Sequence, residues 1–99
     1  MGSLNVTINR EDLEKFDKKA KENYSDRVKV FRQFFVDFVK SNELFEKLKK
    51  IKIEEKDKLR ISIFAKKEDI KTFKIKMIEY DTSAIVQVRK FVKYYIDTE

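Results

Sequence analysis

The chain has 99 residues, a formal net charge of +6, and neither His nor Cys. This length holds one compact domain or two small interlocked ones, and the missing residue types exclude thiol nucleophiles, imidazole bases, disulfides and zinc sites, so we expect no enzyme, no metal and no cofactor. The positive charge favours a polyanionic partner, such as nucleic acid or an acidic membrane surface.

The N-terminal segment predicts a strand followed by a helix. Three apolar and three polar residues alternate over 3–8, which is the period of a strand with one buried face. The apolar residues are Leu4, Val6 and Ile8, and the polar ones are Ser3, Asn5 and Thr7. Asn9 is a suitable N-cap for the helix, and Glu11 and Asp12 suit its positive end. We expect this helix to end near Asn23, which tolerates the left-handed conformation.

A second helix is predicted after Ser25, which can cap it. Its broad apolar stripe needs partners on more than one side, so we expect it to be the core helix. The stripe consists of Val28, Phe31, Phe34, Phe35, Phe38 and Val39. Residues 43–58 then predict an extension of this helix to about Lys50 and a charged connection without Pro or Gly.

The second half of the chain repeats this plan. The alternating strand consists of Leu59, Ile61, Ile63 and Ala65 on one face and Arg60, Ser62 and Phe64 on the other. A helix follows with Lys66 in place of the Asn cap, and Thr82 or Ser83 can cap a last helix with a similar apolar stripe.

The two halves match at a constant offset of 57 residues without a gap. The identical pairs include Phe16 with Phe73, Arg32 with Arg89, and Phe34 with Phe91. Such self-similarity is typical of a supersecondary unit that pairs with its copy to bury its apolar face. The alternative is a chance match between two amphipathic segments of similar composition.

A single strand has no partner for its backbone hydrogen bonds, so we expect the two strands to pair antiparallel over four helices. The predicted fold class is α+β, mainly α, with two β-α-α repeats in one chain. The first repeat spans 1–42, the helical extension and connection 43–58, and the second repeat 59–99. Pairing of strands between two chains satisfies the same pattern.

This order of elements resembles the tandem, single-chain form of the ribbon-helix-helix family of DNA-binding proteins, as in transcriptional regulators of archaeal filamentous viruses. The resemblance rests on the alternating strand 4–8, the helix with Leu13, Phe16 and Ala20, the turn 22–25 and the helix 28–39, with their counterparts 57 residues on. The Gly usual between the helices is replaced by Asn23 or Tyr24 and by Tyr80 or Asp81. The 42% of charged residues leans toward a heat-loving source.

The resemblance implies a transcriptional regulator that inserts its ribbon into the major groove of double-stranded DNA, with further copies on adjacent sites. The implied base-reading residues are Ser3, Asn5, Thr7, Arg60, Ser62 and Phe64. Arg60 suits guanine O6 and N7, and Asn5 suits adenine N6 and N7. Thr7 and Phe64 suit the thymine methyl group. Solvation of an exposed strand face is the alternative, and Phe64 can equally pack on the connection or on another copy.

The resemblance also implies phosphate contacts where the second helix of each half begins. The residues there are Ser25, Arg27 and Lys29 in the first half, and Thr82 and Ser83 in the second. Backbone N–H groups at a helix N-terminus bind anions, and N-capping by the Ser and Thr side chains is compatible with this role. Asp26 opposes a phosphate unless its carboxylate caps the helix, and Arg27 and Lys29 can offset it.

Other functions stay open on sequence grounds. An accessory plasmid or viral DNA-binding protein, an antitoxin, a structural protein that coats DNA and an amphipathic membrane binder each fit part of the pattern. Neighbouring carboxylates such as Glu11 and Asp12 point about 100° apart on a helix and suit its dipole, so catalysis is not expected. No apolar run approaches the roughly 20 residues of a membrane span and no signal peptide is evident, so we expect a cytoplasmic protein.

Overall fold

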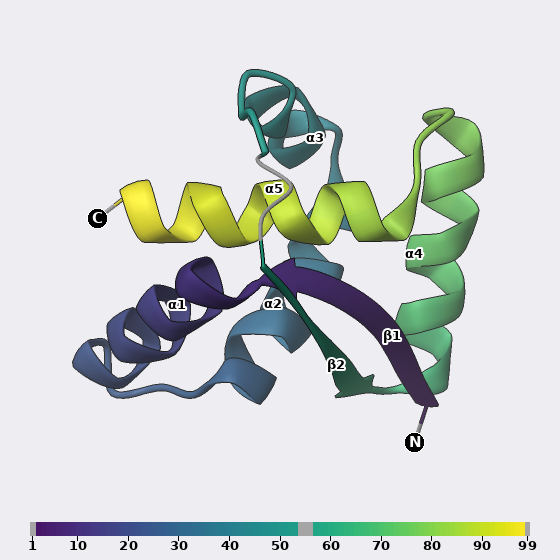
Figure 1. Ribbon diagram of the computed structural model, residues 1–99. Coiled ribbons are helices and arrows are strands. Elements are labelled where there is room, and N and C mark those ends of the chain that lie inside the picture. Colours follow the sequence, from purple (N-terminus) through teal and green to yellow (C-terminus); the bar gives the residue numbers. More distant parts are fainter. Residues whose placement is uncertain (1, 54–56, 99) are drawn as a thin grey trace.

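The computed structural model describes residues 2–53 and 57–98, which form a two-stranded sheet and five helices (Figure 1). In chain order the elements are β1 (Gly2–Asn9), α1 (Arg10–Glu22), α2 (Arg27–Lys40), α3 (Glu43–Leu48), β2 (Lys58–Ala65), α4 (Lys67–Glu79) and α5 (Ala84–Asp97). The predicted class, α+β and mainly helical, is confirmed. Residues 54–56 of the predicted connection lie outside the described residues.

The two strands pair antiparallel, as predicted, from Gly2 opposite Ala65 to Asn9 opposite Lys58. Their apolar residues are buried against the helices: Leu4, Val6, Ile8, Ile61, Ile63 and Ala65. At the middle of the ribbon, Asn5 lies opposite Ser62, 57 residues away. Two positions that the sequence match makes equivalent therefore meet at the centre of the sheet.

The helices of the two halves have equal lengths. α1 and α4 each have 13 residues, and α2 and α5 each have 14. The predicted count of four helices and the predicted extension of α2 are wrong, because α2 ends at Lys40 and Ser41 is extended, with φ −156° and ψ 171°. α3 is a separate helix, so the chain does not consist of two β-α-α repeats alone.

The turns that follow α1 and α4 use left-handed residues other than the predicted Asn23, whose φ is −91°. Tyr24 has φ 57° and Asp81 has φ 52°. Directly after them, the N–H groups of Ser25 and Thr82 donate back to carbonyls in the last turn of the preceding helix. This pairing is the Schellman arrangement, which here forms without glycine.

The core is built mainly from phenylalanine rings. The fully buried rings are Phe16, Phe31, Phe34, Phe35, Phe38 and Phe73. Phe34 of α2 stacks on Phe91 of α5 with ring centroids 4.1 Å apart, and α3 adds Phe45, which stacks on Tyr80 of α4 at 4.2 Å. Two residues of the predicted stripe are exceptions: Val28, in the first turn of α2, is 38% exposed, and Val39 is half-buried.

Candidate nucleic-acid interface

The outward face of the ribbon carries the six predicted base-reading side chains. They form three cross-strand pairs: Ser3 with Phe64, Asn5 with Ser62, and Thr7 with Arg60. Five of the six are exposed, and Thr7 is half-buried. Alternate residues of a strand point to opposite faces, so burial of the apolar set under the helices fixes these six on one surface.

The central pair is joined by a hydrogen bond in which Ser62 Oγ donates to Asn5 Oδ1 at 2.6 Å. This bond assigns the orientation of the Asn5 amide, because Oδ1 is the acceptor and Nδ2 keeps two donors. Oδ1 also keeps a second lone pair. The amide can therefore offer one donor and one acceptor together, which is the pattern that complements N7 and N6 of adenine.

The two ends of the ribbon differ in chemistry. At one end Arg60 provides a planar cationic donor beside Thr7. At the other end Phe64 provides an apolar ring that is 49% exposed, beside Ser3. A ribbon made of two identical strands would carry the same residues at both ends, whereas this one is asymmetric.

Arg89 fastens the ribbon to α5. Its Nε donates to the carbonyl oxygen of Thr7 at 2.7 Å, and its Nη2 donates to Thr7 Oγ1. On α2, Arg32 Nε donates to the carbonyl oxygen of Phe64 at 3.4 Å. Sequence reasoning matched the two arginines but gave them no role, and their identity at equivalent positions was the signal that could have found them.

The predicted phosphate residues lie where α2 and α5 begin, but the helix caps differ in part from those expected. Asp26 caps α2, since its Oδ1 accepts from the Lys29 N–H at 3.0 Å. Ser83 caps α5 by accepting an N–H of the first turn at 3.2 Å. Ser25 and Thr82 lie one residue before these caps, so the predicted cap at Ser25 is wrong and Ser83, not Thr82, caps α5.

Arg27 is paired with α1. Its Nε and Nη2 donate to the two carboxylate oxygens of Asp17 at 3.0 and 2.6 Å. This hydrogen bonding, with the charge of Asp17, raises the pKa of Arg27 against the opposing effect of partial burial. The charge of Arg27 is therefore balanced by Asp17, while Lys29 is exposed.

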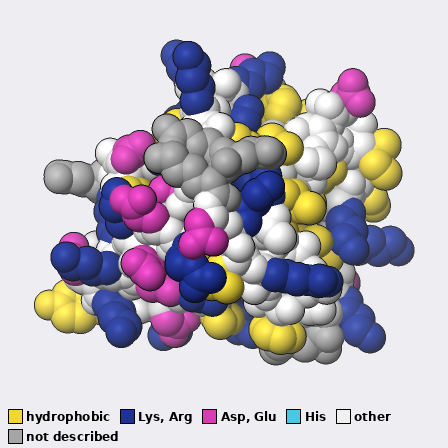
Figure 2. All heavy atoms as spheres, in the orientation of Figure 1, with side chains coloured by type: hydrophobic (Ala, Val, Ile, Leu, Met, Phe, Trp, Pro, Cys, Tyr) yellow, Lys and Arg dark blue, Asp and Glu magenta, His cyan; other side chains and the backbone are white. Residues whose placement is uncertain are grey.

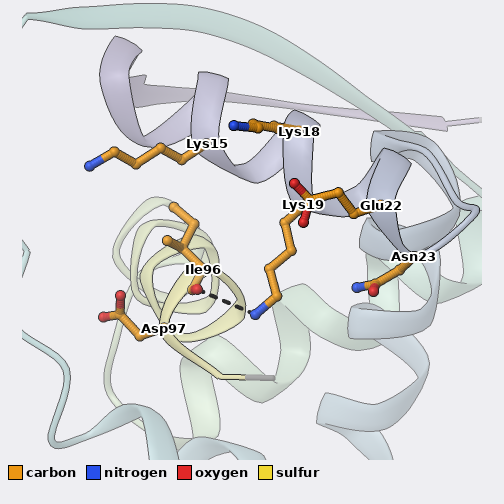
Figure 3. Close-up of a pocket in the computed structure, with 7 residues that line it drawn as sticks. All are labelled: Lys15, Lys18, Lys19, Glu22, Asn23, Ile96 and Asp97. Atoms are coloured by element: carbon orange, nitrogen blue, oxygen red, sulfur yellow. Dashed lines mark hydrogen bonds between the residues drawn. The ribbon is translucent and has the colours of Figure 1, made fainter.

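A groove of about 530 Å³ lies between α1 and the last turn of α5 (Figure 3). Its lining consists of Lys15, Lys18, Lys19, Glu22, Asn23, Ile96 and Asp97. Lys19 reaches across to α5, where its Nζ donates to the carbonyl oxygen of Ile96 at 3.3 Å (Figure 3). None of the predicted base-reading or phosphate residues lines this groove.

No family model, no curated protein and no solved structure matches the chain. Within residues 2–53 and 57–98, no helix is long and apolar enough to cross a membrane. The same residues contain no group of three or more acidic side chains placed to hold a metal ion.

Proposed function

We propose that the protein is a sequence-specific regulator of transcription that binds double-stranded DNA by inserting its β-ribbon into the major groove. The observation that carries the proposal is the two-sided ribbon, with one face buried under helices and the other holding hydrogen-bonding side chains. The major groove of B-DNA is about 12 Å wide and admits a two-stranded ribbon. An accessory DNA-binding protein of a plasmid or virus would use the same contacts.

The chemistry of the outward face supports reading of bases. Arg60 can donate two hydrogen bonds to guanine O6 and N7, and Asn5 offers its donor and acceptor to adenine. The ribbon is also anchored to α5, because Arg89 binds both the backbone and the side chain of Thr7. A site on rigid elements positions its side chains more accurately than a loop does.

The two halves are proposed to be ribbon-helix-helix units joined in one chain, with α3 inserted between them. Their helices agree in length and order, and their equivalent residues Asn5 and Ser62 meet at the ribbon centre. Equivalent rings of Phe34 and Phe91 also stack in the core. These relations are those of a pseudo-two-fold axis through the ribbon.

Attraction to phosphates would supply most of the affinity, and the net charge of +6 favours it. The N-terminus of α5 is the better phosphate site of the two second helices, because its cap is the neutral Ser83. The cap of α2 is the carboxylate of Asp26, which occupies the Lys29 N–H and keeps its negative charge at the helix start, so α2 is less favourable to an anion than α5.

Selection from a randomised duplex-DNA pool, at about 150 mM salt with competitor DNA, tests the proposal. Sequence-specific binding persists in the presence of competitor DNA, whereas non-specific binding does not. We expect a short enriched motif that the Asn5→Ala/Arg60→Ala double variant no longer selects. The Ser41→Ala variant, changed on the α2–α3 junction, should select the wild-type motif. Retention without any motif would indicate a DNA-coating protein, and absence of retention would contradict DNA binding altogether.

A further inference from the structure

A row of lysines runs along α4 from the end of the ribbon. Lys67, Lys71 and Lys74 are spaced four and three residues apart, so they share one face of the helix, and all three are exposed. They line a groove of about 400 Å³ together with Ser3, which also belongs to the outward face of the ribbon. In the described part of the chain, no carboxylate forms an ion pair with any of the three.

The start of this helix packs close beside the start of β1. A Cβ placed on Gly2 would lie 3.2 Å from Ile70 Cδ1 and 3.3 Å from Lys67 Cγ. The lysine row therefore begins beside the Ser3–Phe64 end of the ribbon. At 1.5 Å per residue the row extends about 10 Å along the helix, which is long enough to meet more than one phosphate.

The equivalent positions of α1 are mixed in charge. The residues 57 positions earlier are Arg10, Glu14 and Asp17. Arg10 pairs with Asp57 at 3.1 Å, and Asp17 binds Arg27. Figure 2 shows Asp and Glu side chains mixed with Lys and Arg side chains on the side of α1, and Lys and Arg side chains beside hydrophobic ones along the edge formed by α4. The row of three lysines on α4 therefore has no counterpart at the equivalent positions of α1.

We infer that the α4 row of Lys67, Lys71 and Lys74 is a second DNA-contacting surface, which binds backbone phosphates beyond the Ser3–Phe64 end of the ribbon. This inference rests on the proposed function. Because α1 carries Glu14 and Asp17 at two of the three equivalent positions, the phosphate contacts extend further on one side of the ribbon than on the other. The protein then binds its site in one orientation, with Arg60 at the end of the ribbon away from the extended contacts.

The salt dependence of DNA binding tests the row. Each phosphate contact contributes about 0.9 to the slope of log K against log salt concentration, so Lys67→Gln/Lys71→Gln/Lys74→Gln should lower that slope by about 2 to 3. The matched control, Lys47→Gln/Lys50→Gln/Lys52→Gln, removes the same charge near α3, which lies across α5 from the ribbon (Figure 1). We expect the control to change the slope by less than about 0.9, the contribution of one phosphate contact.

Hydroxyl-radical footprinting on a selected site tests the orientation. Wild-type protection should reach further on one side of the ribbon motif, and the α4 triple variant should lose that extension while it keeps the motif. A symmetric wild-type footprint, or a triple variant with unchanged slope and footprint, would overturn the inference and leave the ribbon proposal standing. Absence of any wild-type DNA binding would instead refute the proposed function.

The groove also holds Ile75 and Ile78, which are 47% and 81% exposed. A basic and apolar helix face is also what an anionic membrane surface attracts. Co-sedimentation with vesicles of anionic phospholipid distinguishes the two partners. Loss of vesicle binding by the α4 triple variant, with DNA binding intact, would assign the row to lipid and overturn the inference.

Discussion

Ser62 Oγ donates a 2.6 Å hydrogen bond to Asn5 Oδ1 at the centre of the ribbon, where the two strands place equivalent positions of the halves side by side. An exact symmetric dimer would put two identical residues at this point. Here the two residues differ, and the hydrogen bond from Ser62 orients the side-chain amide of Asn5. Ser62 therefore has a role in how Asn5 presents its amide, whether or not Ser62 itself contacts a base.

Replacement of Ser62 by Ala should reduce discrimination at the central base pair more than it reduces total affinity. The Asn5 amide loses the partner that fixes its orientation, and a hydrogen bond of this kind contributes about 0.5 to 1.5 kcal/mol. Competition binding with sites altered at the central base pair measures the effect. Because Ser62 is exposed, the free energy of unfolding should change by less than about 0.5 kcal/mol. Unchanged discrimination would show that the orientation of Asn5 is fixed in another way.

Arg60→Lys distinguishes base reading from simple charge. Lysine keeps the positive charge but lacks the planar fork that binds guanine through two hydrogen bonds. We expect the variant to lose about 1 to 3 kcal/mol of preference for the selected site while its affinity for random duplex stays close to wild type. Arg60→Ala should lose the preference for the selected site. It should also lower the slope of log K against log salt concentration by about 0.9. Equal specificity in wild type and the Lys variant would mean that Arg60 contacts a phosphate and does not read a base.

Two Phe→Ala variants should separate the core from the ribbon surface. Phe35 is fully buried, so Phe35→Ala should cost about 3 to 5 kcal/mol of unfolding free energy through lost contacts and a cavity. Phe64 is half-exposed on the ribbon, and Phe64→Ala should cost less than about 1 kcal/mol. Denaturant melts of both variants make the comparison. A large loss for Phe64→Ala would mean that its ring packs on a surface of another copy, which a concentration-dependent melt would reveal.

The local features that the sequence predicts correctly are those set by periodicity. Alternation at Leu4, Val6 and Ile8 was enough to predict the buried face of β1, and the repeated pattern was enough to pair it with β2. The break at Ser41 is not marked by periodicity, although Ser41 and Asn42 are residue types that favour helix caps. No Pro or Gly marks it, and charged and apolar residues continue with helical spacing through α3.

Side-chain contacts between distant segments were also beyond reach of the sequence. Arg89 binds Thr7 across 82 positions, and many polar groups are chemically able to accept from an arginine. The pairing of Arg27 with Asp17 depends on the angle between α1 and α2, which the turn at Tyr24 sets. Sequence patterns predict which face of an element is polar, but not which polar group on another element it meets.

Arg89→Ala should loosen the ribbon from α5. The variant leaves the Thr7 carbonyl without its charged donor, and hydrogen bonds to charged groups contribute about 1.5 to 3 kcal/mol. Amide hydrogen exchange should then rise first in β1 around Thr7, before exchange rises in the helical core. Arg89→Lys is the matched control for charge. An unchanged exchange pattern in the Ala variant would show that strand pairing and core contacts alone hold the ribbon.

Asp17→Asn should strengthen DNA binding, because it releases the charge of Arg27 near the start of α2. The pair is about one-third exposed, so its loss should cost only about 0.2 to 1 kcal/mol of stability. Since Asp17 raises the pKa of Arg27, the pair stabilises the fold below the ordinary pKa of arginine and loses this effect only in strongly alkaline solution, so neutral pH suits the comparison. Asp97→Asn makes the same charge change at the last turn of α5. Fluorescence anisotropy with labelled duplex should show a larger gain in DNA affinity for Asp17→Asn than for Asp97→Asn. Equal gains in affinity would mean that the effect comes from the change in net charge alone.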